Sequence, residues 1–452
     1  MNHASRHCLN AALRPMAGAA NRTSRPGLRP ALAAMWLAAS VGWAQYLEAV
    51  IPVGDTPDDI VWNATSNKVY TPNYGDGTVS VIDGATNQIR ATIRVADYAS
   101  AVCWNSVANK VYCASIDPDW LSVIDGVGDT LIRKVRMRGA PTRMVFNPAM
   151  NKLYVVCIDD HMVRVYDGSA DTLVGEVWFG EITDVYTVLW HPASNRLFCA
   201  TYCGGESDTV FVIDCSMDVI DERRPVGRQP YAMCRNPVNN FIYLATQRAV
   251  YVLSSAGDTV VTQIPGYAND LCAVPFPNKV YALASPGLRV IDCYTHTVID
   301  SVTIAGGVFI CDTLRAKVYS ACEPAPVIDA RADTVLDTLP MGRSPECICW
   351  NSTNSRVYIN DNMDDVVYVI RDTSTGISEP ARSTLARRPL RSTISRGSIK
   401  IRDGFRGVVY DAAGSCVLKS VAGAARRASL NPGAYFVRYD DADEVEKFVV
   451  VK

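Results

Sequence analysis

Histidine is scarce in this sequence, with five residues among 452. Only His161, His191 and His296 lie beyond the first 44 residues, and they share no motif. A nucleophile elbow and a phosphate-binding loop are also missing. General bases and the protein ligands of haem or quinone cofactors draw heavily on histidine. We therefore predict no catalytic residues and no such cofactor.

The sequence has neither an excess of charge of one sign nor a long apolar run. Its 44 basic residues nearly balance 46 acidic ones, whereas a nucleic-acid-binding domain carries a pronounced basic excess. No segment reaches the roughly 18 consecutive apolar residues that a transmembrane helix needs. We expect no nucleic-acid partner and no transmembrane span in the mature chain.

What the sequence does have is a pattern, Asn-Lys-Val-Tyr in its first copy, that occurs eight times. Successive copies are 38 to 45 residues apart. Their last, aromatic residues are Tyr70, Tyr112, Tyr154, Phe198, Tyr243, Tyr281, Tyr319 and Tyr358. A period near forty that is made of short strands is typical of the blades of a β-propeller.

The first repeat predicts one blade of four antiparallel strands. Turn-forming residues separate its apolar stretches, and two glycines in the central turn allow a positive φ. The expected strands are Asp59–Trp62, Lys68–Thr71, Thr78–Asp83 and Gln88–Val95.

The ends of the array indicate how the ring closes. The eighth copy stops after Val366–Ile370 without a fourth strand, and Leu47–Val53 resembles a fourth strand without a blade. Pairing of the two would remove the exposed edges of an open array. We predict an all-β chain: an eight-bladed propeller over residues 45–372, followed by a small C-terminal β-sandwich. Seven blades is the alternative if the copy around Phe309–Ala330 is not a full blade.

Residues 1–44 are predicted to be a signal peptide. This segment has arginines but no acid, an apolar stretch at Ala31–Val41, and small residues just before Gln45. The alternative is an ordinary buried helix. A signal peptide places the protein in the secreted fraction or on the cell surface.

Two residue types recur at fixed places in the repeats. Four of the fifteen cysteines stand nine residues before the repeat aromatic, where other repeats have Val or Leu: Cys103, Cys234, Cys272 and Cys349. We interpret them as small apolar core residues, with disulfides or metal binding as the alternatives. Six aspartates end the third strand and are predicted to cap the next turn: Asp83, Asp125, Asp167, Asp214, Asp292 and Asp329.

A known repeat pattern is found in three segments of the first copy, Asn67–Asn73, Thr78–Asp83 and Thr92–Val95. They are similar to the YVTN family of β-propeller repeats, and the likeness is weakest in the fifth to seventh copies. The resemblance implies an exported or surface-layer protein. It supplies no common catalytic residues.

The composition changes after Asp372. Residues 373–398 are rich in arginine and are predicted to be a basic linker, and residues 399–452 show a compact β pattern. Val409–Gly414, Leu430–Arg438 and the valine strand that ends at Lys452 resemble the C-terminal sorting domain of type IX secretion cargo. The resemblance implies that this segment is a sorting signal that the secretion machinery recognises. A generic β-sandwich is the alternative.

Candidate ligand contacts lie where each blade begins, because the first strands of a propeller converge on the channel mouth. Polar or aromatic residues stand there in front of uniformly apolar ones. The predicted rim residues are Asp58, Asp59, Ser100, Thr142, Arg143, Tyr186, Tyr231, Asn269, Asp270 and Glu346. The alternative is that these side chains are polar only because a channel mouth is wet.

Two functions fit this pattern. The first is a binding module for a protein, glycan or small-molecule ligand, which the shortage of histidine favours. The alternative is a metal-dependent hydrolase of the lactonase-like propeller type. In that case Asp58, Asp59 and Glu346, with Asp270 from across the channel, would hold a divalent cation such as calcium through hard oxygen ligands.

Overall fold

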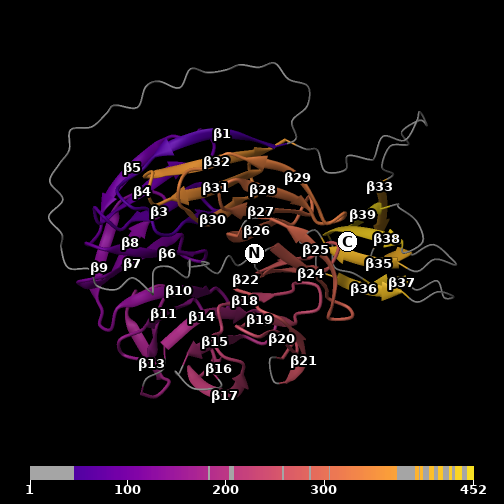
Figure 1. The fold of residues 1–452 in the computed structure, drawn as a ribbon, viewed down its shortest axis with the longest axis horizontal. Helices are drawn as coiled ribbons and strands as arrows, with labels where there is room; N and C mark the ends of the chain where they lie inside the picture. The colour runs from indigo at the N-terminus through magenta and orange to yellow at the C-terminus, as the bar shows by residue number, and fades with distance from the viewer. Residues whose placement is uncertain are drawn as a thin grey trace. The chain divides into compact units, whose positions relative to one another are not determined.

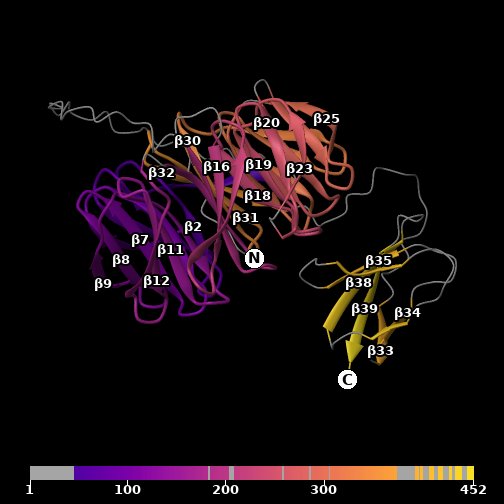
Figure 2. The ribbon, with the colours of Figure 1, turned by 90° about the horizontal axis from the view of Figure 1, so that it is seen from below.

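The computed structural model describes residues 45–181, 184–202, 208–256, 259–284, 287–304 and 306–373, and the backbone of seven strands between 392 and 451. All regular elements in these segments are β-strands (Figures 1 and 2). The chain divides into a propeller and a C-terminal unit. The predicted signal peptide lies outside the described residues.

The propeller consists of eight four-stranded antiparallel sheets, which succeed one another around a ring (Figure 1). Blades 1 to 4 are, from the inner strand outward, β2 (Val61–Asn63), β3 (Lys68–Asn73), β4 (Thr78–Asp83), β5 (Ile89–Arg94); β6 (Ala99–Asn105), β7 (Lys110–Ile116), β8 (Asp119–Asp125), β9 (Leu131–Arg136); β10 (Pro141–Asn147), β11 (Lys152–Cys157), β12 (Met162–Asp167), β13 (Leu173–Trp178); β14 (Asp184–His191), β15 (Arg196–Tyr202), β16 (Asp208–Asp214), β17 (Val219–Val226).

Blades 5 to 8 follow the same plan. They are β18 (Ala232–Arg235), β19 (Ile242–Ala245), β20 (Ala249–Leu253), β21 (Val260–Pro265); β22 (Asp270–Val274), β23 (Lys279–Ala284), β24 (Gly287–Asp292), β25 (Thr297–Thr303); β26 (Val308–Asp312), β27 (Lys317–Ala321), β28 (Ala325–Asp329), β29 (Thr334–Leu339); and β30 (Pro345–Asn351), β31 (Arg356–Asp361), β32 (Val366–Asp372), β1 (Gln45–Pro52). The seventh copy is therefore a full blade.

Strand β1 closes the ring as predicted. It pairs antiparallel with β32, with Ile51 opposite Val367 and Gln45 opposite Asp372. A register shift leaves Glu48 as a bulge, and each of the other seven outer strands has a register shift at the corresponding place. Since such bulges twist an edge away from further pairing, β1 serves as the eighth outer strand.

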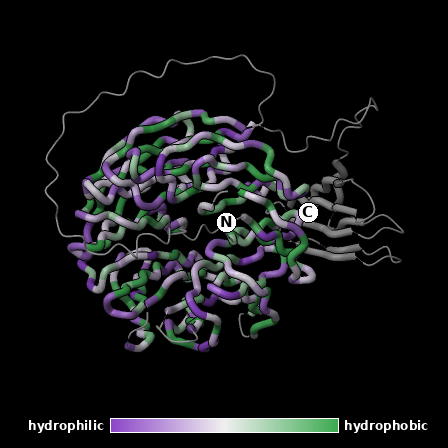
Figure 3. Tube along the Cα trace, in the orientation of Figure 1, coloured by the Kyte–Doolittle hydropathy of each residue, from purple (hydrophilic) through white to green (hydrophobic). Residues whose placement is uncertain are grey.

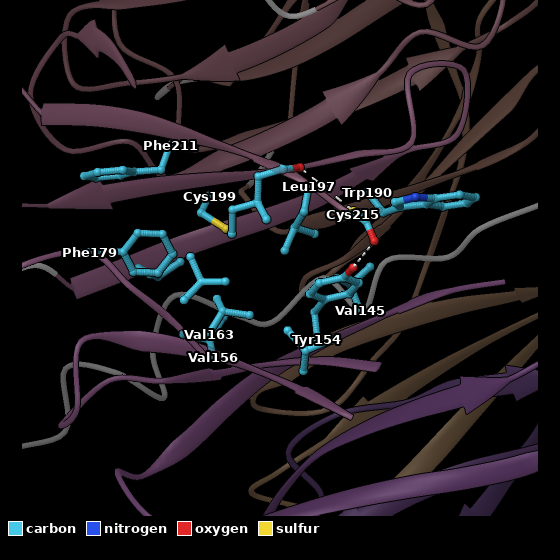
Figure 4. Close-up of a cluster of buried hydrophobic side chains, with 14 residues drawn as sticks. Val145, Tyr154, Val156, Val163, Phe179, Trp190, Leu197, Cys199, Phe211 and Cys215 are labelled. Carbon is cyan, nitrogen blue, oxygen red and sulfur yellow. Dashed lines mark hydrogen bonds between the residues drawn. The ribbon is translucent and has the colours of Figure 1, made fainter. Parts of the chain in front are cut away.

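Apolar side chains fill the space between neighbouring blades. The tyrosines of the repeat are among the most deeply buried residues, and apolar stretches occur in strands all round the ring (Figure 3). Between blades 3 and 4, Tyr154 and Val156 meet Leu197 and Cys199 (Figure 4). The twelve cysteines whose side chains are described are all buried, as expected of residues that stand in for valine.

At five of the eight junctions, the repeated Lys and Tyr join one blade to the next through one carboxylate. Lys68 Nζ lies 2.6 Å from Asp129 Oδ1, and Tyr70 Oη donates to the same oxygen at 3.2 Å. Asp129 sits at positive φ in the turn before the outer strand of blade 2. Lys and Tyr meet Asp171, Asp218 and Asp333 at equivalent turn positions, and they meet Asp372 at the end of β32. We call these contacts the clasps, and the side of the ring that carries them the clasp face.

The recurrent aspartates cap turns, as predicted. Asp83 Oδ1 accepts the N–H groups of Ala85 and Thr86, both at 2.9 Å. The other five bond main-chain N–H groups in the same way. These bonds satisfy turn donors that no strand pairs.

The C-terminal unit contains a five-stranded sheet in the order β33 (Ser392–Arg396), β39 (Val445–Val451), β38 (Gly433–Tyr439), β35 (Gly407–Asp411) and β36 (Cys416–Ser420). A second sheet pairs β34 (Ser398–Lys400) with β37 (Arg427–Ser429). Strand β33 lies within the segment for which we predicted a linker, and it pairs parallel to β39.

Candidate ligand-binding face

The predicted rim residues lie on the side of the ring opposite the clasps. This side, which we call the loop face, carries the connections from one blade to the next and the hairpins between second and third strands. On it Tyr74 N donates to Thr56 O at 2.8 Å, which joins one loop of each kind. Every blade follows the same path, so corresponding loops of all eight blades lie on this face.

A local irregularity positions four of the rim side chains. Ser100, Thr142, Tyr186 and Glu346 each fall at a register shift at the start of an inner strand. A bulge turns a side chain out of the regular alternation of a strand, and such bulges are common beside binding sites. The sequence indicated the position but not the bulge.

None of the ten predicted rim residues is fully exposed. Asp58, Asp59, Ser100, Arg143, Asp270 and Glu346 are buried, and Thr142, Tyr186, Tyr231 and Asn269 are half-buried. The Ser100 Oγ, Thr142 Oγ1 and Asn269 Oδ1 atoms are buried without a hydrogen-bond partner among the described residues. Buried polar atoms ordinarily have partners, so water or a ligand would satisfy these three.

Asp59 and Asp270 link adjacent inner strands. Asp59 Oδ2 accepts the N–H of Val102 at 2.9 Å, and Asp270 Oδ2 accepts that of Phe309 at 3.0 Å. Burial raises the pKa of Asp59 to about 8, and the neighbouring charge of Asp58 adds to the shift. Asp270 thus bonds the next blade along the ring.

The residues proposed to hold a cation are partly occupied by the protein itself. Asp59 Oδ1 accepts the N–H of Ile60 at 2.8 Å, and Asn362 Nδ2 donates to Glu346 Oε1. Blades 8 and 1 do meet here, because Cys347 Sγ lies 3.5 Å from Asp58 O. Among the described residues, no group of three or more His, Cys, Asp or Glu side chains could hold a metal ion.

The loop face of blades 8 and 1 is acidic. Asp55 N donates to Asp76 Oδ2 at 3.2 Å, and Thr56 N donates to Asp365 Oδ1 at 2.8 Å, which ties loops of the two blades together. Asp364 Oδ1 accepts from Arg343 Nε at 2.7 Å. Sequence reasoning missed these carboxylates, although two aspartate-rich turns were there to indicate them.

The loop face of blades 4 and 5 is rich in tyrosine. The rings of Tyr186 and Tyr202 meet edge to face at 5.7 Å, and those of Tyr231 and Tyr267 do the same at 5.7 Å. Burial raises the pKa of Tyr231, and the phenols of Tyr267 and Tyr186 raise it further. The two pairs lie on neighbouring blades, whose inner strands β14 and β18 are in contact. We call Tyr186, Tyr202, Tyr231 and Tyr267 the tyrosine sector.

Tyr202 and Tyr267 were missed because neither stands at the position next to an inner strand at which the sequence placed the rim residues. Tyr202 ends β15, and Tyr267 lies in the connection from β21 to β22. Only the folded blade brings them against Tyr186 and Tyr231. The repeat alignment could have found Tyr267, since it lies two residues before Asn269.

Solved structures share this architecture. BamB from Moraxella catarrhalis has a TM-score of 0.57 at 12% identity, over 72% of this chain and 99% of that chain. The chain has a β-propeller fold. The dihydro-heme d1 dehydrogenase NirN, solved in complex with DHE, has a TM-score of 0.57 at 13% identity, over 74% of this chain and 76% of that one.

Hydrazine synthase of Kuenenia stuttgartiensis has a TM-score of 0.52 at 15% identity, over 73% of this chain and 99% of that chain. These neighbours differ in function, and at such identities they show the fold alone. No protein-family model and no curated protein matches the chain. No helix among the described residues is long and apolar enough to cross a membrane.

Proposed function

We propose that this propeller is a binding module whose ligand contacts the loop face, chiefly at the tyrosine sector. The observation that carries the proposal is the pair of edge-to-face tyrosine contacts on neighbouring blades, with ring centroids 5.7 Å apart in each. Tyrosine gives large contact area at a low cost in side-chain entropy and is enriched at binding hot spots.

The proposal extends to where the protein works. We infer that residues 1–44 direct export, that the repeats belong with the YVTN propellers, and that residues 399–452 act as a type IX sorting domain. The arginine-rich, acid-free leader and the small residues just before Gln45 support a mature chain that begins there. Mass spectrometry of the secreted protein should find Gln45 at its N-terminus. Removal of residues 399–452 should abolish release to the cell surface.

Arrays of peptides and glycans, probed with the secreted full chain, test the binding role. We expect the double variant Tyr186→Ser/Tyr231→Ser to bind its targets at least tenfold more weakly, the scale of a hot-spot loss. The matched control is Tyr98→Ser. Tyr98 is exposed, belongs to another tyrosine pair at 5.1 Å, and occupies the connection from β5 to β6. Equal binding by both variants would place the ligand on another surface.

A further inference from the structure

Three loop-face segments of blade 5 form one compact surface, which we call the blade 5 patch. They are residues 227–231, 246–248 and 265–268. Gln247 N donates to Arg228 O at 3.0 Å, and Gly266 N donates to Arg248 O at 2.7 Å. The contact between Tyr231 and Tyr267 joins the first segment to the third. Backbone bonds therefore fix the relative positions of two arginines and two tyrosines.

The blade 5 patch exposes arginine, while the carboxylate of Asp208, which accepts the N–H of Gln229 at 2.6 Å, is buried behind it. Its three segments contain Arg228 and Arg248 but no acidic residue. A third guanidinium, that of Arg289 in β24, lies beneath the last segment and donates to the carbonyls of Pro265 at 2.6 Å and Tyr267 at 3.0 Å. Burial lowers the pKa of Arg289. Its positive charge thus lies in a partly desolvated place.

One donor of the patch and one donor in the adjoining strand β24 lack a partner. The Nε atoms of Arg228 and Arg289 are buried and have no hydrogen-bond acceptor among the described residues. Arg248, by contrast, is exposed. An uncompensated guanidinium gains most from a carboxylate or phosphate, because the planar fork matches those groups and the hydrogen bonds are charge-assisted.

The opposite side of the ring has the opposite charge. Inner strands contact their neighbours in chain order, and β30 contacts β2, so blade 5 lies across the channel from blade 1. The loops of blades 8 and 1 carry Asp55, Asp76, Asp364 and Asp365. An acidic ligand would be attracted to one side of the loop face and repelled from the other, which fixes where it binds.

We infer that the blade 5 patch binds an acidic segment of a protein partner, with ligand carboxylates on Arg228 and Arg248 and side chains packed on Tyr231 and Tyr267. This rests on the proposed binding function and names its ligand chemistry. The combination of tyrosine and arginine favours a protein ligand, because these residues dominate protein–protein hot spots. Ligand carboxylates would pair with the exposed guanidinium of Arg248 and the half-buried guanidinium of Arg228.

Isothermal titration calorimetry with the full chain tests the inference. The probes are a Gly-Glu repeat peptide, its Gly-Gln counterpart of the same length, and polygalacturonate as an acidic glycan. We expect the Gly-Glu peptide to bind, more weakly as salt rises, and the Gly-Gln peptide to bind at least tenfold more weakly. Arg228→Gln/Arg248→Gln should cost roughly tenfold or more, the scale of lost charge-assisted hydrogen bonds.

The matched control is Arg343→Gln. Arg343 is an exposed arginine on the loop face of blade 8, where it pairs with Asp364, and its removal should leave peptide binding unchanged. Equal binding of both peptides, no binding of either, or binding of polygalacturonate alone would overturn the inference. If the arrays still depend on Tyr186 and Tyr231 in that case, the binding role stands and only the ligand chemistry is wrong. If they do not, the proposed function fails as well.

Discussion

The two faces of the propeller use the same repeat in different ways. On the clasp face, one Lys–Tyr pair meets one aspartate at five of the eight blade junctions. On the loop face, corresponding positions hold aspartate in blade 1, serine in blade 2 and tyrosine in blades 4 and 5. A contact that holds neighbouring blades together can be repeated from junction to junction, whereas a surface that recognises one ligand needs loops that differ.

Removal of Gln45–Pro52 should have the largest effect. It would take the outer strand from blade 8 and break the bonds of Arg356 with Glu48 and of Gln45 with Asp372. We expect loss of the single cooperative unfolding transition and aggregation through the exposed edge of β32. Calorimetry and size-exclusion chromatography would measure this. Tyr46→Ser, at an exposed position of β1, should remain a folded monomer.

Removal of one hydroxyl compares the faces directly. Tyr112 Oη is buried and donates to Asp171 Oδ1 at 2.7 Å, so Tyr112→Phe should lower the free energy of unfolding by about 1.5–3 kcal/mol. Tyr267 is 38% exposed, and Tyr267→Phe should change the free energy of unfolding by no more than about 0.5 kcal/mol. Urea denaturation of both variants gives the two values. Similar losses of unfolding free energy in the two variants would contradict a structural role for the clasp face and a binding role for the loop face.

The pH dependence of stability should contain a contribution from Asp59. Its folded pKa of about 8 lies above the unfolded value, so the folded chain binds the proton more tightly. The contribution is complete below the unfolded pKa and is lost as pH rises toward 8. Stability relative to Asp59→Asn should therefore fall across this window in urea denaturation. A rise with pH would mean that Asp59 is ionised in the fold.

Calcium should have the smallest effect. A cation at Asp59 would displace the N–H groups of Ile60 and Val102 and leave them buried without acceptors. We expect the same Tm in calcium chloride and in EDTA. A calcium-dependent rise that Asp59→Ala abolishes would instead support the metal-dependent hydrolase.

Periodicity made much of the propeller predictable. The strands, the closing role of Leu47–Val53 and the turn-capping aspartates all follow from local patterns that recur every blade. Small differences remain: the first inner strand is Val61–Asn63 rather than Asp59–Trp62, because the Asp59 carbonyl accepts the hydroxyl of Thr71 instead of a backbone N–H of the ladder.

The contacts between blades were beyond a local pattern. Lys68 and Asp129 are 61 residues apart, and the local sequence around either residue does not indicate the other as its partner. The candidate site shows the same limit. The sequence found Tyr186 and Tyr231 from their place in the repeat, but Tyr202, Tyr267 and Arg228 join them only through loops whose paths depend on the folded blade.

Because Gln45 lies opposite Asp372, the chain enters and leaves the propeller ring at the same blade, blade 8. Whatever precedes or follows these residues is tethered at blade 8. Blade 4 is diametrically opposite in the ring order, with blade 5 next to it. Within the ring, the tyrosine sector is therefore as far as it can be from the strands at which the chain enters and leaves.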